Sequence, residues 1–407
     1  MSAPTPAPRR INLRTPEVME RVQAEVESHY RSELVEEIRA RGGALRVGAT
    51  TVRLAKQFGF CYGVERAIDL AYAARKVFPT QRIFLLGEII HNPDVNAQIA
   101  EMGIRHLAAH PSDVDIDGLH PEDIVIVPAF GAEVEIVNAV KAHGCQIVDT
   151  TCGDVMSVWK RVRQNAREQV TSIIHGKAAH EETRATASRA LGEANDRSEG
   201  GGHYLVVLDL EETDAVCDYI RNGGDKETFL QRFDGAVSPG FDPEVHLRKV
   251  GVANQTTMLR SETEEVQRRV RKAIADRDGG EGGGNFRFFD TICGATQERQ
   301  DALFDLLDAP LDMLIVVGGY NSSNTTHLAE IGEKKVPTYF VRNATCLHSA
   351  NEIARYDLHE KREILSTNWL PTGPLCIGIT AGASCPNNLI EDVIRRVLEL
   401  RGEDYAK

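Results

Sequence analysis

The sequence predicts an α/β protein in which three related α/β units with parallel-type sheets surround a central cavity, as in a trefoil. From residue 47 onward, short apolar stretches alternate with amphipathic segments, which is typical of parallel strands joined by helices. Three successive segments repeat the same order of features, and each begins with a cysteine at an expected strand-to-helix turn. Because ligands bind beyond the carboxyl ends of parallel strands, a pseudo-threefold arrangement would bring the special residues of all three units together.

The repeat rests on the spacing of short motifs. Cys61, Cys152 and Cys293 precede a strand-ending glycine by 26, 24 and 25 residues, and each glycine leads into a polar cluster that opens a further helix. A later strand in each repeat ends in small or polar residues. The expected strands of the body are 83–86, 124–127, 172–174, 204–208, 250–253, 286–289, 313–317 and 376–379.

We expect four segments along the chain. They are an N-terminal extension (1–46), a first unit (47–148), a second unit (149–289) and a third unit (290–407). The extension holds one amphipathic helix, which begins after Thr15, ends at Gly42 and is expected to lie on the body of the protein. The second unit is longer because of three loop-like stretches at 192–202, 222–243 and 278–285.

Composition excludes several classes of function. The chain of 407 residues has a net charge of -13, which argues against nucleic acid as a ligand because phosphate backbones require basic surfaces. No run of about 18 apolar residues predicts a membrane span, and the N-terminus lacks the apolar core of a signal peptide, so we expect a cytoplasmic protein. The eight cysteines include no C-x-x-C pair, which argues against a zinc ribbon or a ferredoxin-like run.

The three repeated cysteines predict a metal centre. Buried cysteines are often only small apolar side chains, but core packing gives no reason for three of them at equivalent positions. A helix N-terminus favours the thiolate form, and thiolates suit zinc or iron–sulfur clusters. Three cysteines leave one iron of a four-iron cluster without a protein ligand, and zinc with three cysteines and water is the alternative. The remaining cysteines lack this register and are interpreted as structural: Cys145, Cys217, Cys346, Cys376 and Cys385.

Polar clusters after the repeated strands predict an anion site with a nearby acid. Hydroxyl groups and free N–H groups at a helix start bind anions, and plain N-capping explains one residue of the run Asn321-Ser322-Ser323-Asn324 but not four in a row. Ser384 holds the parallel position at the end of a later strand, and His91 and His180 occupy equivalent places in the first two units. These are candidate phosphate donors.

Glu182 and Thr256 are the candidate groups for proton transfer. Glu182 can be interpreted as a first-turn acid that complements the helix dipole, or as the proton donor that reductive loss of a hydroxyl requires. Thr256 ends the matching strand of the second unit and could relay a proton or orient a substrate hydroxyl. No G-x-G-x-x-G follows a strand and no P-loop is present, so electrons for a reduction would have to come from a separate redox protein.

Taken together in order, these motifs resemble the 4-hydroxy-3-methylbut-2-enyl diphosphate reductase family (IspH/LytB) from about residue 52 to residue 400. The motifs that carry the resemblance are Gly59-Phe60-Cys61-x-Gly63-Val64, His91-Asn92, Asp149-Thr150-Thr151-Cys152, Gly176-Lys177-Ala178-Ala179-His180-Glu181-Glu182, Gln255-Thr256-Thr257, Ile292-Cys293-x-Ala295-Thr296, Asn321-Ser322-Ser323-Asn324 and Thr380-Ala381-Gly382-Ala383-Ser384.

The resemblance implies a trefoil around one [4Fe-4S] cluster with one open iron, held by Cys61, Cys152 and Cys293. It implies reductive dehydroxylation of (E)-4-hydroxy-3-methylbut-2-enyl diphosphate to isopentenyl and dimethylallyl diphosphate, the last step of the methylerythritol phosphate pathway of isoprenoid biosynthesis. Glu182 would carry the proton with help from Thr256, which would also contact the substrate. The diphosphate would be held by His91, His180, Ser322, Ser323, Asn324 and Ser384.

One position departs from the pattern of many bacterial members, which have a histidine where this chain has Phe130. That departure and the N-terminal helical extension resemble the plant and cyanobacterial branch. The resemblance further implies electrons from a ferredoxin or flavodoxin-type donor, and a monomer or homodimer with no nucleic-acid or membrane partner.

Two other functions fit part of the pattern. Quinolinate synthase is also three-lobed, with three cysteines and an open iron, and it is a dehydratase without net reduction. The Asn-Ser-Ser-Asn and His-Glu-Glu clusters and the order of the motifs favour the reductase. A non-enzymatic iron–sulfur sensor would require neither a proton-donor glutamate nor an anion pocket, and the sequence has no recognisable DNA-binding element to transmit a signal.

Overall fold

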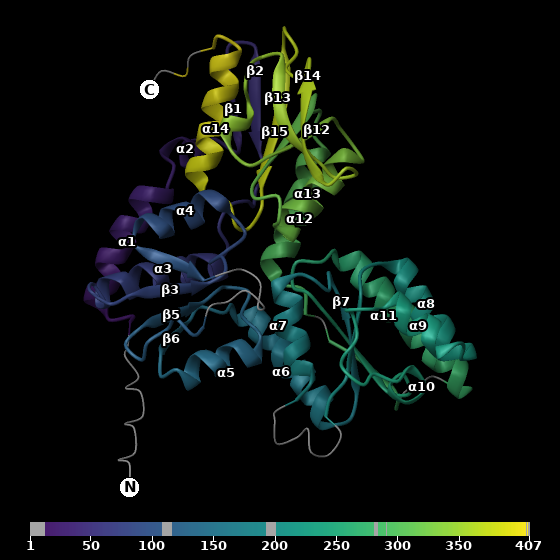
Figure 1. Cartoon of the computed structure of the whole chain (residues 1–407). Coiled ribbons are helices and arrows are strands. Elements are labelled where there is room, and N and C mark those ends of the chain that lie inside the picture. The colour runs from purple at the N-terminus through teal and green to yellow at the C-terminus, as the bar shows by residue number, and fades with distance from the viewer. Residues whose placement is uncertain are drawn as a thin grey trace.

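The computed structural model describes residues 13–107, 116–192, 201–280, 284–289, 291–403 and 405. Three mainly parallel sheets lie in three lobes around a common centre, as the predicted trefoil of α/β units requires (Figure 1). The first 12 residues of the expected extension and residues 193–200 of an expected loop lie outside the described residues. In the part of the chain that is described, no helix combines the length and apolar character needed to cross a bilayer.

The three sheets share one strand order, which explains the sequence repeat. The first sheet is β4 (Ile104–Leu107), β3 (Ile83–Leu86), β5 (Ile124–Val127) and β6 (Gln146–Asp149). The second is β8 (Tyr204–Val207), β7 (Thr171–His175), β9 (Val250–Asn254) and β10 (Phe286–Phe288). The third is β12 (Thr338–Val341), β11 (Met313–Val317), β15 (Leu375–Ala381) and β2 (Thr50–Leu54), to which β1 (Ala44–Val47) adds an antiparallel edge strand.

Helices cover these sheets in the same repeated order. The first lobe contains α3 (Tyr62–Val77), α4 (Pro93–Glu101) and α5 (Val134–Ala142). The second contains α6 (Gly153–Arg167), α7 (Glu181–Ala190), α8 (Leu210–Asn222), α9 (Lys226–Arg232), α10 (Pro243–His246) and α11 (Arg260–Asp278). The third contains α12 (Gly294–Leu307), α13 (Ser323–Glu333) and α14 (Asn387–Leu400), with a short 3-10 turn at Ala344–Cys346.

Each cysteine of the triad lies where the chain passes from one lobe to the next. The strand before it is the last parallel strand of one sheet, and the helix after it packs in the following lobe. Thus β6 ends the first sheet while α6 packs on β7 and β9 of the second. By the same pattern β10 leads to α12 of the third lobe, and β2 leads to α3 of the first.

This pattern corrects the expected start of the first unit at residue 47. Strand β2 pairs in parallel with β15, with Val52 opposite Ile377, so the residues before Cys61 belong to the sheet of the third unit. The sequence repeat begins at the cysteine, whereas the strand that feeds it completes the preceding sheet. For the first repeat, that preceding sheet is formed by the C-terminal part of the chain.

The expected single N-terminal helix is two helices, α1 (Pro16–Tyr30) and α2 (Glu33–Ala40). Ser32 caps α2 by accepting from the Val35 N–H, and its hydroxyl donates to Glu391 of α14 at 2.6 Å. Helix α1 packs on α3 of the first lobe, whereas α2 packs against α14 of the third. The described part of the extension therefore lies on the body, as expected, and the break lets each helix follow a different lobe.

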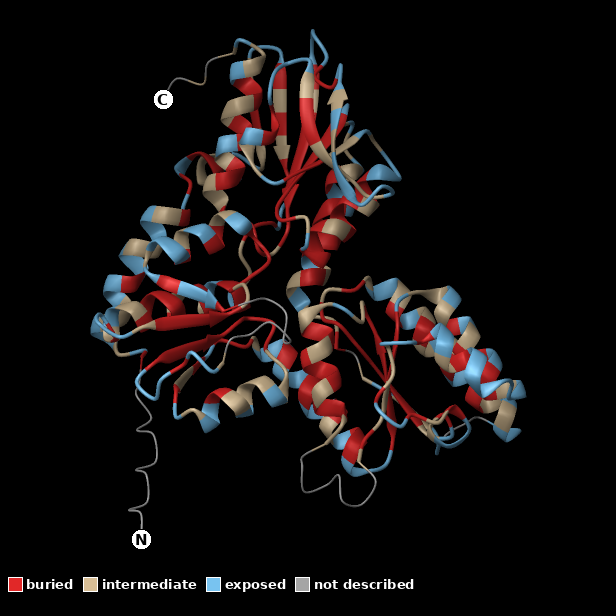
Figure 2. Ribbon diagram, viewed as in Figure 1, coloured by how far each residue is buried: buried red, intermediate tan, exposed pale blue. Residues whose placement is uncertain are grey.

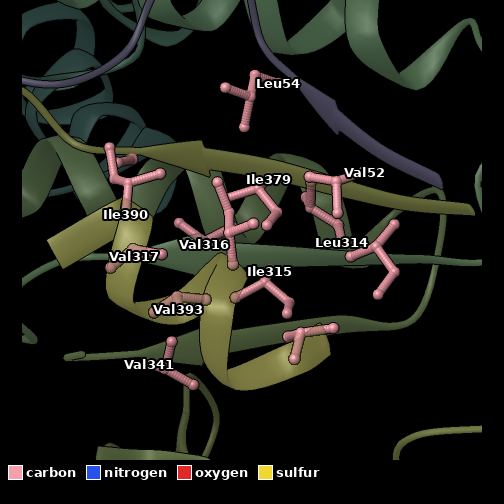
Figure 3. Close-up of a cluster of buried hydrophobic side chains, with 14 of the residues drawn as sticks. Val52, Leu54, Leu314, Ile315, Val316, Val317, Val341, Ile379, Ile390 and Val393 are labelled. Atoms are coloured by element: carbon pink, nitrogen blue, oxygen red, sulfur yellow. The ribbon is translucent and has the colours of Figure 1, made fainter. Parts of the chain in front are cut away.

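A second antiparallel hairpin, β13 (Glu352–Asp357) with β14 (Arg362–Thr367), extends the third lobe and was not expected from the sequence. Buried residues gather on the strands of each lobe and along the helices nearest the centre (Figure 2). In the third lobe, the central strand β11 is buried along its whole length (Figure 3).

We predict that Leu314→Ala in β11 lowers the free energy of unfolding by about 3 kcal/mol, because deletion of a buried leucine side chain leaves a cavity. Leu314 is fully buried and fits against Gly332 and Gly378, where any larger side chain would collide with it. Urea denaturation followed by circular dichroism measures the loss. Leu365→Ala, at a side chain 60% exposed on β14, is the matched control and should cost less than about 0.5 kcal/mol. Equal losses in the two variants would contradict this description of the core.

Candidate active site

A cavity of about 650 Å³ lies where the three lobes meet. It is lined by residues from all three units, at the carboxyl ends of the parallel strands and the first turns of the helices that follow. Every residue that the sequence analysis proposed for the site lines this cavity: Cys61, Cys152, Cys293, His91, His180, Glu182, Thr256, Ser322, Ser323, Asn324 and Ser384. The prediction that these residues lie together is therefore confirmed by the geometry.

The three cysteines occupy equivalent positions in detail. Each is the N-cap residue of a helix, Cys61 of α3, Cys152 of α6 and Cys293 of α12. Each backbone N–H donates to a carbonyl at the end of the neighbouring inner strand. The acceptors are Ala383 at 3.2 Å for Cys61, Ala129 at 2.8 Å for Cys152 and Thr256 at 3.3 Å for Cys293. One backbone hydrogen bond thus fixes each cysteine against the residues that follow an inner strand, and these residues are small or polar.

Burial raises the pKa of two of these thiols. It raises the pKa of Cys152, and it raises the pKa of Cys293 to about 12 although the N–H of Thr296 donates to its sulfur at 3.3 Å. At these two cysteines the effect of burial on the pKa exceeds that of the hydrogen bonds at the helix N-terminus. Coordination to a metal removes such protons, because the thiolate is the ligand form.

Gly63 packs closely against the sulfur atoms of two of the cysteines. A Cβ at Gly63 would lie 2.6 Å from Sγ of Cys152 and 3.9 Å from Sγ of Cys61. Glycine in the first turn of α3 therefore keeps two of the three sulfur atoms clear of side chains. A bulkier residue would occupy the space between them.

Two histidines form the wall of the cavity next to the anion-site residues. His91 stacks on Phe130 with ring centroids 4.5 Å apart and an angle of 8° between the planes, and it meets His180 edge to face at 4.9 Å. Nδ1 of His91 lies 3.0 Å from Glu88, and Nδ1 of His180 accepts from the N–H of Glu182 at 3.2 Å. Burial lowers the pKa of His180 well below its usual range, so this ring is neutral and its other nitrogen, Nε2, carries the proton.

The outward nitrogens of both rings are buried and have no hydrogen-bond partner among the described residues, and the same holds for Nδ2 of Asn324. Nε2 of His180 and Nδ2 of Asn324 carry protons and are donors. Nε2 of His91 lies 3.8 Å from Glu181 and is a donor only in the protonated ring, because Nδ1–H meets Glu88. All three residues line the cavity. Because buried polar groups are normally satisfied, unpartnered donors at one cavity wall indicate that a ligand with several acceptor oxygens binds there.

The Ser322–Asn324 segment begins helix α13 at this wall. Ser322 is the N-cap, and the hydroxyl of Ser384 approaches it at 3.4 Å while donating to the carbonyl of His91 at 3.2 Å. Asn324 accepts from the N–H of Ala383 at 2.9 Å, which joins the start of α13 to the end of β15. Hydroxyl groups and helix N–H groups are thereby gathered at one place, which is a suitable site for an anion.

Glu182 lies in the first turn of α7 and is buried, with 4% of its surface exposed. Its Oε1 accepts from the backbone N–H of Thr256 at 2.6 Å, which holds the carboxyl group against the end of β9. Burial raises the pKa of Glu182, and the hydrogen bonds from Thr256 offset only part of that effect. A buried carboxylic acid at a cavity wall can hold a proton at a pH where an exposed one is ionised.

Two residues that the sequence analysis did not assign to the site connect its parts. Gln255 links the second and third units, since its amide donates to Ser323 at 3.1 Å while its oxygen accepts from Thr183 at 3.1 Å. Arg299 is buried on α12, and its guanidinium donates to the carbonyls of Gly59 at 2.6 Å and Ala295 at 2.9 Å. Arg299 therefore joins the segments that carry Cys61 and Cys293. The row of polar residues on the buried face of α12 was the available signal for it.

Metal-binding geometry separates two groups of side chains. Among the described residues, His91, His180 and Glu181 are the group whose ligand atoms all lie within 4.8 Å of one another. The three cysteine sulfur atoms are spread more widely than that. A single tetrahedral zinc ion would require sulfur atoms about 3.8 Å apart, given zinc–sulfur bonds of about 2.3 Å. The cysteine positions therefore suit a larger group better than one zinc ion.

The other five cysteines lie outside the cavity lining, as the sequence analysis expected. Cys145, Cys217, Cys346 and Cys385 are buried, and Cys376 is half-buried on β15. Cys385 follows Ser384 directly, but its thiol lies within the core of the third lobe.

Comparison with known proteins places the chain in a family. A family model described as LytB protein matches residues 52–398. A relative from Synechococcus sp. strain RCC307, named 4-hydroxy-3-methylbut-2-enyl diphosphate reductase, is 48% identical over 383 residues, with 94% of this chain and 91% of the relative covered. A protein of the same name from Gloeobacter violaceus is 47% identical, with 94% and 90% covered.

Solved structures agree with the fold. A structure described as (E)-4-hydroxy-3-methyl-but-2-enyl diphosphate reductase, the terminal enzyme of the non-mevalonate pathway, superimposes with a TM-score of 0.52 at 25% identity over 86% of this chain and all of that one. The corresponding reductase from Plasmodium falciparum gives a TM-score of 0.61 at 20% identity over 85% and 87%, which supports the fold alone. With a family match across most of its length and relatives that are nearly half identical, this chain belongs to the LytB family of oxidoreductase enzymes.

Proposed function

We propose that this enzyme reductively removes the hydroxyl group of (E)-4-hydroxy-3-methylbut-2-enyl diphosphate, giving isopentenyl and dimethylallyl diphosphate. The observation that carries the proposal is the composition of one cavity. Three equivalent cysteines, a buried carboxylic acid and a wall of unpartnered donors line it together. A reductase of an allylic diphosphate requires one group of each kind. The names of the cyanobacterial relatives support the same substrate.

Cys61, Cys152 and Cys293 would hold a [4Fe-4S] cluster. The donor set fits such a group, because the sulfur atoms come from three helix N-termini and lie farther apart than a single zinc ion would allow. When bound, the cluster would supply electrons and a Lewis-acidic iron for the substrate hydroxyl.

The polar groups at the start of α13 and on the two histidines would bind the diphosphate. His180 and Asn324 offer buried N–H groups, and the His91 ring adds one when it is protonated. Hydroxyl groups at the same place come from Ser322, Ser323 and Ser384. The free N–H groups of that helix turn favour negative charge. The cysteines line the same cavity, so a substrate bound here would reach them with its carbon end.

Glu182 would deliver the proton. It is the buried acid of the cavity, and the N–H of Thr256 holds one of its oxygen atoms in place, so its other oxygen can carry a proton toward the substrate. The Thr256 hydroxyl lies beside this carboxyl group and would orient the substrate hydroxyl or relay the proton. The raised pKa suits a general acid that works near neutral pH.

We predict that the anaerobically reconstituted protein oxidises reduced methyl viologen only when the hydroxylated diphosphate is added. Glu182→Gln should lower this rate at least 100-fold while the absorption spectrum of the cluster is unchanged, because general acid catalysis contributes about 10²–10⁴-fold. Stopped-flow or steady-state absorbance of the viologen measures both. An intact cluster with no substrate-dependent oxidation in the wild-type protein would refute the proposal and direct the search to dehydrations.

We predict that Cys61→Ser, Cys152→Ser and Cys293→Ser each lose most of the cluster, because each removes a thiolate ligand. Iron and sulfide content and absorbance after reconstitution provide the measurement. Cys217→Ser, at a buried cysteine of the second lobe, is the matched control and should retain wild-type cluster content. Full cluster retention in any of the three triad variants would contradict its assignment as a ligand.

We predict that Glu182→Gln stabilises the cluster-free protein at neutral pH but not in acid. The pKa of Glu182 is raised by burial, so the folded protein holds this proton to a higher pH than the unfolded chain does. Stability is consequently lost as the pH rises from the unfolded value of about 4.5 through the raised value, and glutamine avoids this loss. The gain in Tm of Glu182→Gln over wild type should grow between pH 4.5 and 8.

The matched control is Glu298→Gln, which removes a charge from an exposed glutamate that also lines the cavity. A gain in Tm that grows equally with pH in both variants would show that net charge, rather than burial of Glu182, determines the effect.

A further inference from the structure

Helix α6 carries a basic, exposed face that begins at one of the proposed cluster ligands. Its sequence after Cys152 contains four basic residues and one acidic residue, although the whole chain has a net charge of -13. Lys160 and Arg161 are exposed, and Met156 lies one helical turn before Lys160, with 40% of its surface exposed. Side chains four residues apart share a helix face, so an apolar and a basic side chain lie together close to Cys152.

The same face reaches the segment that leads to Cys293. The guanidinium of Arg161 lies over the ring of Phe289 at 4.8 Å, and Arg287 pairs with Glu168 at the end of α6 at 2.7 Å. We call Met156, Lys160 and Arg161 the α6 patch. It combines one exposed apolar side chain with two positive charges, and through the contact of Arg161 with Phe289 it also borders the segment that leads to Cys293.

The acidic groups near the patch do not cancel its charge. Asp154, in the first turn of α6, is exposed and lines the cavity, and Glu168 is already paired with Arg287. A strongly acidic chain would repel an acidic protein over most of its surface. An acidic partner is therefore directed to a local basic face, and charged residues at such a contact determine association rate and orientation.

We propose that the α6 patch is the docking surface for a small acidic iron–sulfur protein that carries one electron at a time. The inference rests on the proposed function, which consumes two electrons per substrate, and the sequence contains no dinucleotide motif through which a reductant could bind. Two carriers are each oxidised by one electron. The two electrons and two protons convert the substrate C–OH bond into a C–H bond and release water. A carrier that docks here lies beside Cys152 and Cys293, so its electron has only a short distance to travel to the cluster.

The test compares two electron donors on the holoenzyme. Lys160→Glu/Arg161→Glu should lower kcat/KM for a reduced acidic [2Fe–2S] ferredoxin at least tenfold at low ionic strength, because rim charges control the association rate. Turnover with reduced methyl viologen, which needs no docking surface, should stay within twofold of wild type. The wild-type rate with ferredoxin should fall as salt is added, and the variant should lose most of this salt dependence.

Two further variants test whether the loss of activity with ferredoxin is specific to the α6 patch. Lys141→Glu/Arg271→Glu makes the same charge change at exposed residues of α5 and α11, outside the cavity lining, and should leave both donors nearly unaffected. Lys160→Glu alone should show a smaller loss with ferredoxin, and it leaves the Arg161 contact with Phe289 in place.

Equal loss with both donors, or an equal effect of the control pair, would overturn the docking proposal while leaving the proposed function intact. Absence of viologen turnover in the wild-type holoenzyme would instead overturn the proposed function, and the docking proposal with it.

Discussion

Three equivalent backbone hydrogen bonds hold the site of this enzyme together. The N–H groups of Cys61, Cys152 and Cys293 each donate to a carbonyl at the end of an inner strand. Since the strand before each cysteine completes one sheet and the helix after it packs in the next lobe, each bond stands at a junction between two lobes. The cavity consequently exists only where all three lobes meet, and no single lobe contains a complete set of cysteines.

The same arrangement explains how an acidic protein forms a site suited to anions. The cavity lining contains one basic side chain that is charged throughout the physiological range, Arg299, which is already engaged by two carbonyls. Positive potential has to come mainly from helix N-termini. Three of them carry the cysteines, and those of α7 and α13 present His180 and Ser322 as caps. Partial charges from N–H groups stabilise an anion without a long basic side chain that would compete for space.

The parts of the site that could be predicted from sequence are those fixed by local motifs. A cysteine at a strand-to-helix turn and a polar cluster at a helix start each depend on a few adjacent residues, and the repeat showed that they converge. Gln255 and Arg299 depend instead on what lies opposite them in another unit, which spacing does not encode. For the same reason the sequence did not reveal that β2 belongs to the third sheet, because its pairing partner β15 lies more than 300 residues later in the chain. The division of the extension into α1 and α2 likewise follows from two lobes that only the folded protein brings together.

Phe130, at the position where the sequence departs from the histidine of many bacterial members, orients His91 in the anion site that we propose. Its ring stacks flat on His91, and Glu88 holds the Nδ1 edge of that histidine, so the imidazole is fixed on its face and on one side. Only Nε2 is left to meet a ligand; it is buried, has no hydrogen-bond partner and lies 3.8 Å from Glu181. Phe130 therefore offers a ligand no hydrogen bond of its own. It orients instead the hydrogen bond that Nε2 of His91 can make. It also keeps that side of the cavity apolar, next to His180 and the buried Glu182, where water would otherwise compete for the proton that we propose Glu182 to deliver.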